Sequence, residues 1–353
     1  MTRWIDALVE LRARGLPAVI VSVASTKGSA PREAGTRMIV ARDSVHGTIG
    51  GGHLELQAIS IARDLLVGAG NDGERLRRFP LGASLGQCCG GLVNLLFEPA
   101  IGALPWLDVL VALRRDGASS VLVSATRGAA DGGRLIVTVD DTQGTLDAHD
   151  AAAIRAAREL LASGAGARLW RGGDNTDAPL YFLDPIRASD FDIVLFGAGH
   201  VGRALVGVLA DIDCRVTWVD ARDDAFPADV PATIDVVCTD APEQEVDAAR
   251  PGSYFLVMTH SHPLDEALAE RILRRNDVAY FGLIGSLAKR RQFERRMERR
   301  GMPPARFAAM TCPIGVAGIP GKEPATIAIA VAAELLQVRA RAIAGARVAS
   351  AQR

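Results

Sequence analysis

Apolar residues follow two different patterns along this chain. Upstream of about residue 186, short β-type runs alternate with amphipathic helical stretches, which predicts an α+β domain. The runs are 18–24, 36–41, 92–97, 120–125 and 135–139, and the helical stretches lie near 4–14, 53–67, 105–115 and 150–163. From Phe191 onward the order becomes strand, helix, three strands, helix, strand and helix, with a last helix from Pro324. Apolar strands alternating with helices predict a parallel, doubly wound sheet.

We therefore predict an α/β protein of two domains. An α+β domain spans residues 1–186, and a Rossmann-like domain with a doubly wound parallel sheet spans 187–353. The polar stretch LDPIRASDFD at 183–192 is the expected boundary. We find no internal repeat with a period of about 20 to 50 residues.

Composition narrows the class of protein. The 353 residues carry a formal net charge of −1 and no long run of one sign, so we expect neither a nucleic-acid nor a membrane-surface partner. Residues 1–15 lack the features of a signal peptide, and the apolar run 327–333 is too short to span a bilayer. A cytoplasmic location follows as an expectation. Five cysteines without framework spacing are expected to be free thiols.

The most regular motif is the run DIVLFGAGHVGRAL at 192–205, in which a strand ends in G-x-G-x-x-G. Gly197, Gly199 and Gly202 permit a tight turn and let backbone N–H groups approach a phosphate where the next helix begins. Asp220 ends the following strand, where a carboxylate can accept hydrogen bonds from a ribose. The same glycines also serve close packing of helix on strand, so the motif alone predicts the fold more firmly than an NAD site.

Three later loops follow strands of the same predicted sheet. THSHPLD brings together His260, His262 and Asp265; it fits a metal site less well than an Asx- or His-mediated helix cap with hydrogen bonds to a ligand, because a tetrahedral site lacks a further ligand. LIGSLAKRRQF places its basic residues behind a glycine turn, either as an anion site or as a solvated basic helix; the residues are Gly285, Ser286, Lys289, Arg290 and Arg291. CPIGVAGIPGK carries Cys312 and Lys322 before a buried helix, which is typical of a functional loop.

Two glycine-rich segments stand out in the N-terminal half. In HGTIGGGHLE, Gly50, Gly51 and Gly52 lead into a helix with His53 and Glu55, so the backbone either wraps an anion or forms a strained hairpin bulge. In LGQCCGG, Cys88 and Cys89 are adjacent and flanked by glycines. Exposed backbone lets a sulfur atom approach a ligand, which favours a functional thiol that binds a soft metal or transfers sulfur.

These segments occur together and in order with SVASTKGSAPREAGTRM, MTHSHPLDEA and CPIGVAGIPGKEPATIA. Over residues 21–336 the chain closely resembles the XdhC/CoxI family of xanthine dehydrogenase accessory proteins. Ser261 departs from the pattern, since an acidic residue is expected between the two histidines, and this further weakens a metal site in that loop.

The resemblance implies a maturation factor rather than an enzyme. Such proteins bind the molybdenum cofactor, hold it while a cysteine desulfurase supplies the terminal sulfido ligand, and deliver it to the molybdenum subunit of xanthine dehydrogenase; a homodimer is expected. The cofactor carries a phosphate and a dithiolene-bound metal, which glycine loops, basic side chains and a soft ligand would suit. Cys88 or Cys89 would contact molybdenum or relay sulfur. The expected cofactor-binding residues are Gly50, Gly51, Gly52, Cys88, Cys89, Gly197, Gly199, His200, Gly202, Asp220, His260, His262, Gly285, Ser286 and Lys289.

Two other classes of function stay open at this point. An NAD(P)-dependent oxidoreductase would use Asp220 on the adenosine ribose and His260 or His262 as an acid or base, but it rests on analogy of fold. An assembly partner that binds the dehydrogenase without cofactor would leave the glycine loops and the cysteine pair unexplained.

Overall fold

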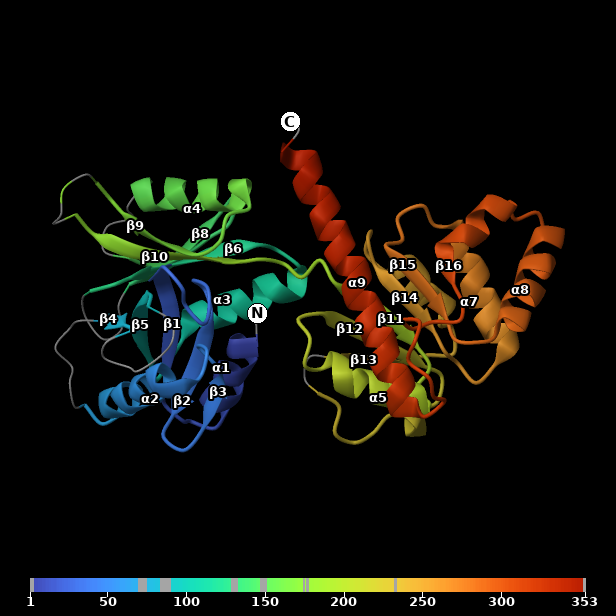
Figure 1. The fold of residues 1–353 in the computed structure, drawn as a ribbon, viewed down its shortest axis with the longest axis horizontal. Coiled ribbons are helices and arrows are strands. Elements are labelled where there is room, and N and C mark those ends of the chain that lie inside the picture. Colours follow the sequence, from blue (N-terminus) through green and yellow to red (C-terminus); the bar gives the residue numbers. More distant parts are fainter. Residues whose placement is uncertain are drawn as a thin grey trace. The chain divides into compact units, whose positions relative to one another are not determined.

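The computed structural model describes residues 3–68, 75–82, 90–127, 133–146, 151–173, 175, 178–231 and 234–351. The chain divides into two compact units, Met1–Ala188 and Ser189–Arg353 (Figure 1). The first mixes helices with antiparallel sheets and the second holds a parallel sheet, so the predicted α/β class is confirmed.

The first unit contains two antiparallel five-stranded sheets. Sheet one has the order β3-β2-β1-β5-β4 and sheet two the order β8-β7-β6-β10-β9. The strands of sheet one are β1 (Ala18–Lys27), β2 (Arg37–Ala41), β3 (Val45–Gly47), β4 (Leu76–Pro80) and β5 (Leu92–Ala100). Those of sheet two are β6 (Ser120–Ala125), β7 (Arg134–Val137), β8 (Thr142–Thr145), β9 (Arg168–Arg171) and β10 (Leu180–Ile186). The helices are α1 (Arg3–Ala13), α2 (Gly52–Leu66), α3 (Pro105–Asp116) and α4 (Ala151–Ser163).

Alternation along the strands explains how these elements stack. In β1, Val19, Val21 and Val23 pack against α2, while Ala18 and Ile20 on the opposite face pack with α1 and α3. Sheet two repeats the arrangement, with Val121 and Val123 facing α4. On the other face of sheet two, Leu122 and Ile136 pack in the same apolar cluster as α1 and α3. Each sheet is therefore buried on both faces.

The polar stretch predicted as a boundary is partly a strand. Residues 183–186 complete β10, which pairs with both β6 and β9. The polarity of Asp184 suggests an exposed linker residue. In the structure its carboxylate is buried and lies 2.5 Å from the Arg37 guanidinium on β2. Burial raises the pKa of the Asp184 carboxyl, and the Arg37 charge beside it opposes that rise.

The second unit is a six-stranded parallel sheet with the order β13-β12-β11-β14-β15-β16. The strands are β11 (Asp192–Phe196), β12 (Arg215–Asp220), β13 (Ile234–Cys238), β14 (Tyr254–Val257), β15 (Tyr280–Leu283) and β16 (Met310–Thr311). Its helices are α5 (His200–Leu209), α6 (Glu243–Ala248), α7 (His262–Arg274), α8 (Leu287–Arg299) and α9 (Pro324–Ala351), with short 3₁₀ turns at Asp223–Ala225 and Pro304–Ala309.

Helices cover both faces of this sheet. Leu205 of α5 and Val331 of α9 pack on the face that carries Leu195 and Trp218. On the other face, α6, α7 and α8 bury Phe255 and its neighbours. The order and the two-sided cover are those of a Rossmann fold, as the sequence predicted. Among the described residues, no helix is long and apolar enough to cross a membrane.

Candidate functional site

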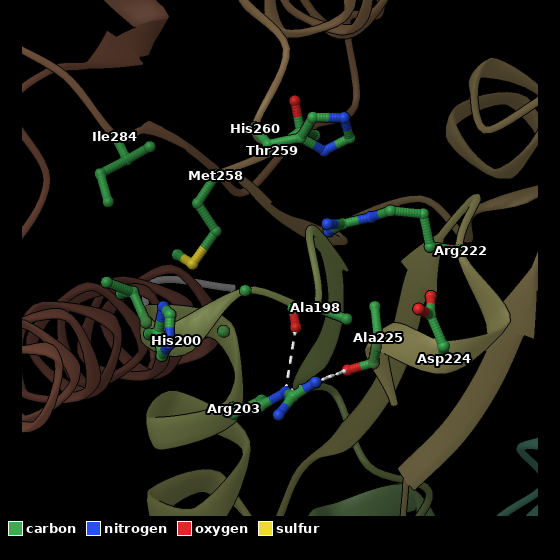
Figure 2. A pocket seen from close by; sticks show the side chains of 13 residues that line it. Ala198, His200, Arg203, Arg222, Asp224, Ala225, Met258, Thr259, His260 and Ile284 are labelled. Atoms are coloured by element: carbon green, nitrogen blue, oxygen red, sulfur yellow. Dashed lines mark hydrogen bonds between the residues drawn. The ribbon is translucent and has the colours of Figure 1, made fainter. Parts of the chain in front are cut away.

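A pocket opens where the strand order of the parallel sheet reverses. β11 lies between β12 and β14, and the loops that leave β11 and β14 diverge at their carboxyl ends. Ligands of doubly wound sheets bind at this switch point. The pocket has a volume of about 530 Å³ and is lined by Ala198, Gly199, His200, Val201, Gly202, Arg203, Arg222, Asp224, Ala225, Met258, Thr259, His260 and Ile284 (Figure 2).

Two of the fingerprint glycines, Gly197 and Gly202, lie where no side chain fits. A Cβ on Gly197, whose φ is +115°, would lie 2.4 Å from the Met258 carbonyl oxygen. A Cβ on Gly202 would lie 2.1 Å from the Gly197 carbonyl oxygen. Gly199 precedes α5, and no side chain caps that helix. The first N–H groups of α5 are therefore available to an anion in the pocket.

Asp220 is fully engaged by the protein. Its Oδ2 accepts the Ala198 N–H at 2.7 Å and Arg222 Nη2 at 3.0 Å, and its Oδ1 accepts the backbone N–H and the Nε–H of Arg222 at 3.0 Å each. A carboxylate offers about four lone-pair sites. The structure thus uses Asp220 to bind the glycine loop to Arg222 and leaves it little capacity for the ribose contact that the sequence suggested.

This clamp predicts a pH-dependent stability of the second unit. Burial works to raise the pKa of Asp220, but the hydrogen bonds from Arg222 and Ala198 outweigh it and lower the pKa to about 2. Since the folded-state pKa is depressed, the stabilisation is present above the unfolded pKa and is lost as pH falls toward 2. We expect Asp220→Asn to lower the free energy of unfolding by about 1–2 kcal/mol at pH 7 and to flatten its fall between pH 4 and pH 2. Urea unfolding followed across that range tests this, and a parallel fall in both proteins would contradict it.

The pocket lining is rich in cationic groups. Arg203 donates to the carbonyls of Ala198 and Ala225, which holds its guanidinium at the rim. The half-exposed Arg222 points into the space between Ala198 and His260 in Figure 2. His200 and His260 are both exposed, and Asp224 is the one acidic residue of the lining. Donors around a helix start suit an anionic ligand such as a phosphate ester.

The THSHPLD loop is organised by its serine and aspartate. Ser261 caps α7 by accepting the Leu264 N–H, so the expected Asx or histidine cap is replaced by a serine cap. His260 lines the pocket, and the exposed His262 begins α7. No group of three or more potential metal-ligating residues occurs in the described ranges.

Asp265 holds this loop from the helix side. Its carboxylate accepts the N–H and the hydroxyl of Thr259 at 3.1 and 2.7 Å. Lys289 reaches the same carboxylate at 2.6 Å and also donates to the Ile284 carbonyl. The pair is buried, so the structure places the Lys289 ammonium inside the protein, between two pocket loops.

The neighbouring GSLAKR segment is a capped helix start. Ser286 accepts the Lys289 N–H and caps α8, and a Cβ on Gly285 would lie 2.6 Å from the Cδ of Lys289. Cys312 lies below this turn with its thiol 3.7 Å from the Ser286 carbonyl oxygen, and burial raises the pKa of that thiol. Gly285 and Ser286 are thus next to Ile284 of the pocket but are not part of its lining.

In the first unit, the glycine triplet already wraps a carboxylate. Glu55 accepts the Thr48 hydroxyl at 2.5 Å and the N–H groups of Ile49 and Gly51 at 3.0 and 3.1 Å. Burial works to raise the pKa of Glu55, and these hydrogen bonds lower it overall. Gly50, Gly51 and Gly52 all have positive φ and lead into α2 rather than into a strand, which excludes the hairpin-bulge alternative.

Two glycines pack closely on the loop 28–36 between β1 and β2. A Cβ on Gly50 would collide with Pro31, and a Cβ on Gly91 would lie 2.0 Å from the Ser29 carbonyl oxygen. Gly50 of GTIGGG and Gly91, the last residue of LGQCCGG, therefore both lie against this loop. Cys88 and Cys89 themselves lie outside the described residues.

Sequence reasoning did not single out the cationic wall of the pocket. Arg203 follows the last fingerprint glycine, and Arg222 and Asp224 follow Asp220 closely. The signal was present, since residues just past a strand end line the ligand crevice of this fold.

Two family models match this chain. The XdhC Rossmann domain matches residues 193–335, and the XdhC and CoxI family matches residues 11–80. Among curated proteins, the uncharacterized protein YqeB of Escherichia coli K12 is 29% identical over 156 residues, which is 43% of this chain and 28% of that protein. The match therefore spans less than a third of YqeB.

A solved structure shares the whole fold. It is a Bacillus halodurans protein described as a xanthine dehydrogenase, 21% identical, with a TM-score of 0.68 over 96% of each chain. At this identity the likeness shows the fold alone.

Proposed function

Because its two ends match two models of one family, the chain belongs to the XdhC and CoxI family, and we propose that it is a maturation factor for a molybdenum dehydrogenase. In this proposal it binds the molybdenum cofactor, holds it while a cysteine desulfurase supplies the sulfido ligand, and delivers it to the molybdenum subunit of xanthine dehydrogenase. It acts in the cytoplasm as a homodimer.

The observation that carries the proposal is the donor-rich pocket at the switch point. Helix N–H groups, Arg222 and His260 face a space of about 530 Å³, which suits a phosphorylated ligand of the size of a pterin cofactor. The buried ion pair of Asp265 and Lys289 fixes the loops that carry Thr259 and Ile284, two residues of the lining.

The first unit carries a second set of candidate ligand residues. Gly91 follows the Cys88–Cys89 pair and lies against the loop 28–36, since a Cβ there would be 2.0 Å from the Ser29 carbonyl oxygen. A thiolate of Cys88 or Cys89 would reach a soft metal or accept sulfur.

Anaerobic equilibrium binding of the molybdenum cofactor tests the proposal, with NADH titrated in parallel. We expect near-stoichiometric binding by the unmodified protein and at least tenfold weaker binding by the double variant Cys88→Ser, Cys89→Ser. Cys238→Ser, at an exposed cysteine of β13, is the matched control and should bind as the unmodified protein does.

The other outcomes point to the other classes of function. Tight NADH binding without cofactor binding would favour an oxidoreductase. Failure of both ligands, with association to the dehydrogenase preserved, would leave an assembly partner.

A further inference from the structure

The first unit contains the same order of elements twice. Each half runs helix, three strands, helix and two strands, and each sheet arranges its strands as third, second, first, fifth and fourth. The helix between the third and fourth strands covers the outer face of its sheet in both halves. The period is far longer than the one excluded by inspection of the sequence.

The first helices of the two halves also share a sequence. RWIDALVELRARG at 3–15 aligns with PWLDVLVALRRDG at 105–117, so that Trp, Asp and Arg recur at matched positions. Gly15 and Gly117 end these segments, with φ of +66° and +69°. Glycine recurs there because a left-handed residue closes each helix.

The contacts between the halves are exchanged pairs. Arg12 of α1 lies 2.6 Å from Asp108 of α3, and Arg114 of α3 lies 2.6 Å from Asp6 of α1. The rings of Trp4 and Trp106 stack on each other, 6.3 Å apart. Reciprocal pairs around a residue that meets its own equivalent are the signature of a twofold axis.

Two buried ion pairs are related by the same twofold axis. Arg37 on the second strand of the first half pairs with Asp184 on the last strand of the second half. Arg134 on the second strand of the second half pairs with Glu98 on the last strand of the first half. Arg37 covers the ring of Trp4 at 4.4 Å, and Arg134 covers that of Trp106 at 4.5 Å.

We infer that residues 3–186 are a tandem duplication of one module, folded as a pseudo-twofold pair. The matched order of elements, the exchanged ion pairs and the stacked rings of Trp4 and Trp106 carry this inference.

Exchanging the equivalent helices tests the duplication without any ligand. In the full chain, residues 3–13 take the sequence of 105–115 and the reverse. We expect a thermal midpoint within about 5 °C of the unmodified protein, because Trp, Asp and Arg keep their partners. The control shifts both inserted sequences by one position, which removes those partners and should lower the midpoint by more than about 10 °C. Equal loss of stability in both exchanges would overturn the duplication.

Discussion

Replacing Arg37 with alanine is expected to remove about 3–5 kcal/mol of the unfolding free energy of the first unit. The loss is large because the guanidinium joins the two sheets in the dry interior. It contacts Asp184 at 2.5 Å and the Ser22 hydroxyl at 2.9 Å, and it covers the ring of Trp4. Without it, Asp184 is a buried carboxylate that loses its cationic partner. Urea unfolding monitored by tryptophan fluorescence measures the change, since Trp4 lies at the site.

Arg12→Ala is the matched control for this prediction. Arg12 also forms an ion pair with an aspartate of the other half. Its partner Asp108 is 63% exposed, so solvent screens the pair. We expect a cost below about 1 kcal/mol. If both alanine variants proved equally mild, the buried pairs would not be what holds the sheets together.

The regular parts of this fold follow from the sequence because they obey a single period. The apolar strands of the second unit and its glycine fingerprint predict the parallel sheet and the position of its pocket. The hydrophobic pattern does not predict the strands β9 and β10. Asp184 and Arg168 break their apolar alternation, and only a partner on another sheet makes Asp184 a core residue. The hydrophobic pattern along one strand gives no information about a partner such as Arg37 on another sheet.

The site shows the same division. The three fingerprint glycines are visible in the sequence, and in the structure two of them, Gly197 and Gly202, have no room for a Cβ. The state of Asp220 is not visible there. It depends on a side-chain rotamer of Arg222, two residues on, which turns a ribose acceptor into a structural clamp. The duplication is equally hidden, because conserved contacts lie between halves whose loops have diverged.

Two substitutions in the glycine fingerprint should separate its structural role from its ligand role. Gly202→Ala is expected to cost about 3 kcal/mol or more, because the new Cβ would lie 2.1 Å from the Gly197 carbonyl oxygen and neither backbone can yield. The loop would move away from α5, and the pocket would be lost with it. In this variant, urea unfolding should therefore show a lower free energy of unfolding, and ligand titration should show no binding.

Gly199→Ala is expected to leave stability within about 0.5 kcal/mol and yet to weaken ligand binding at least tenfold. Its φ is −75°, which alanine adopts freely, and a Cβ there meets no protein atom within 4 Å. That empty space is the pocket itself, where a phosphate must approach the first N–H groups of α5. Titrating the molybdenum cofactor and NADH against the same variant shows which ligand the methyl group obstructs. Unchanged affinity for both would mean that the fingerprint of this chain packs a helix on a strand and holds no phosphate.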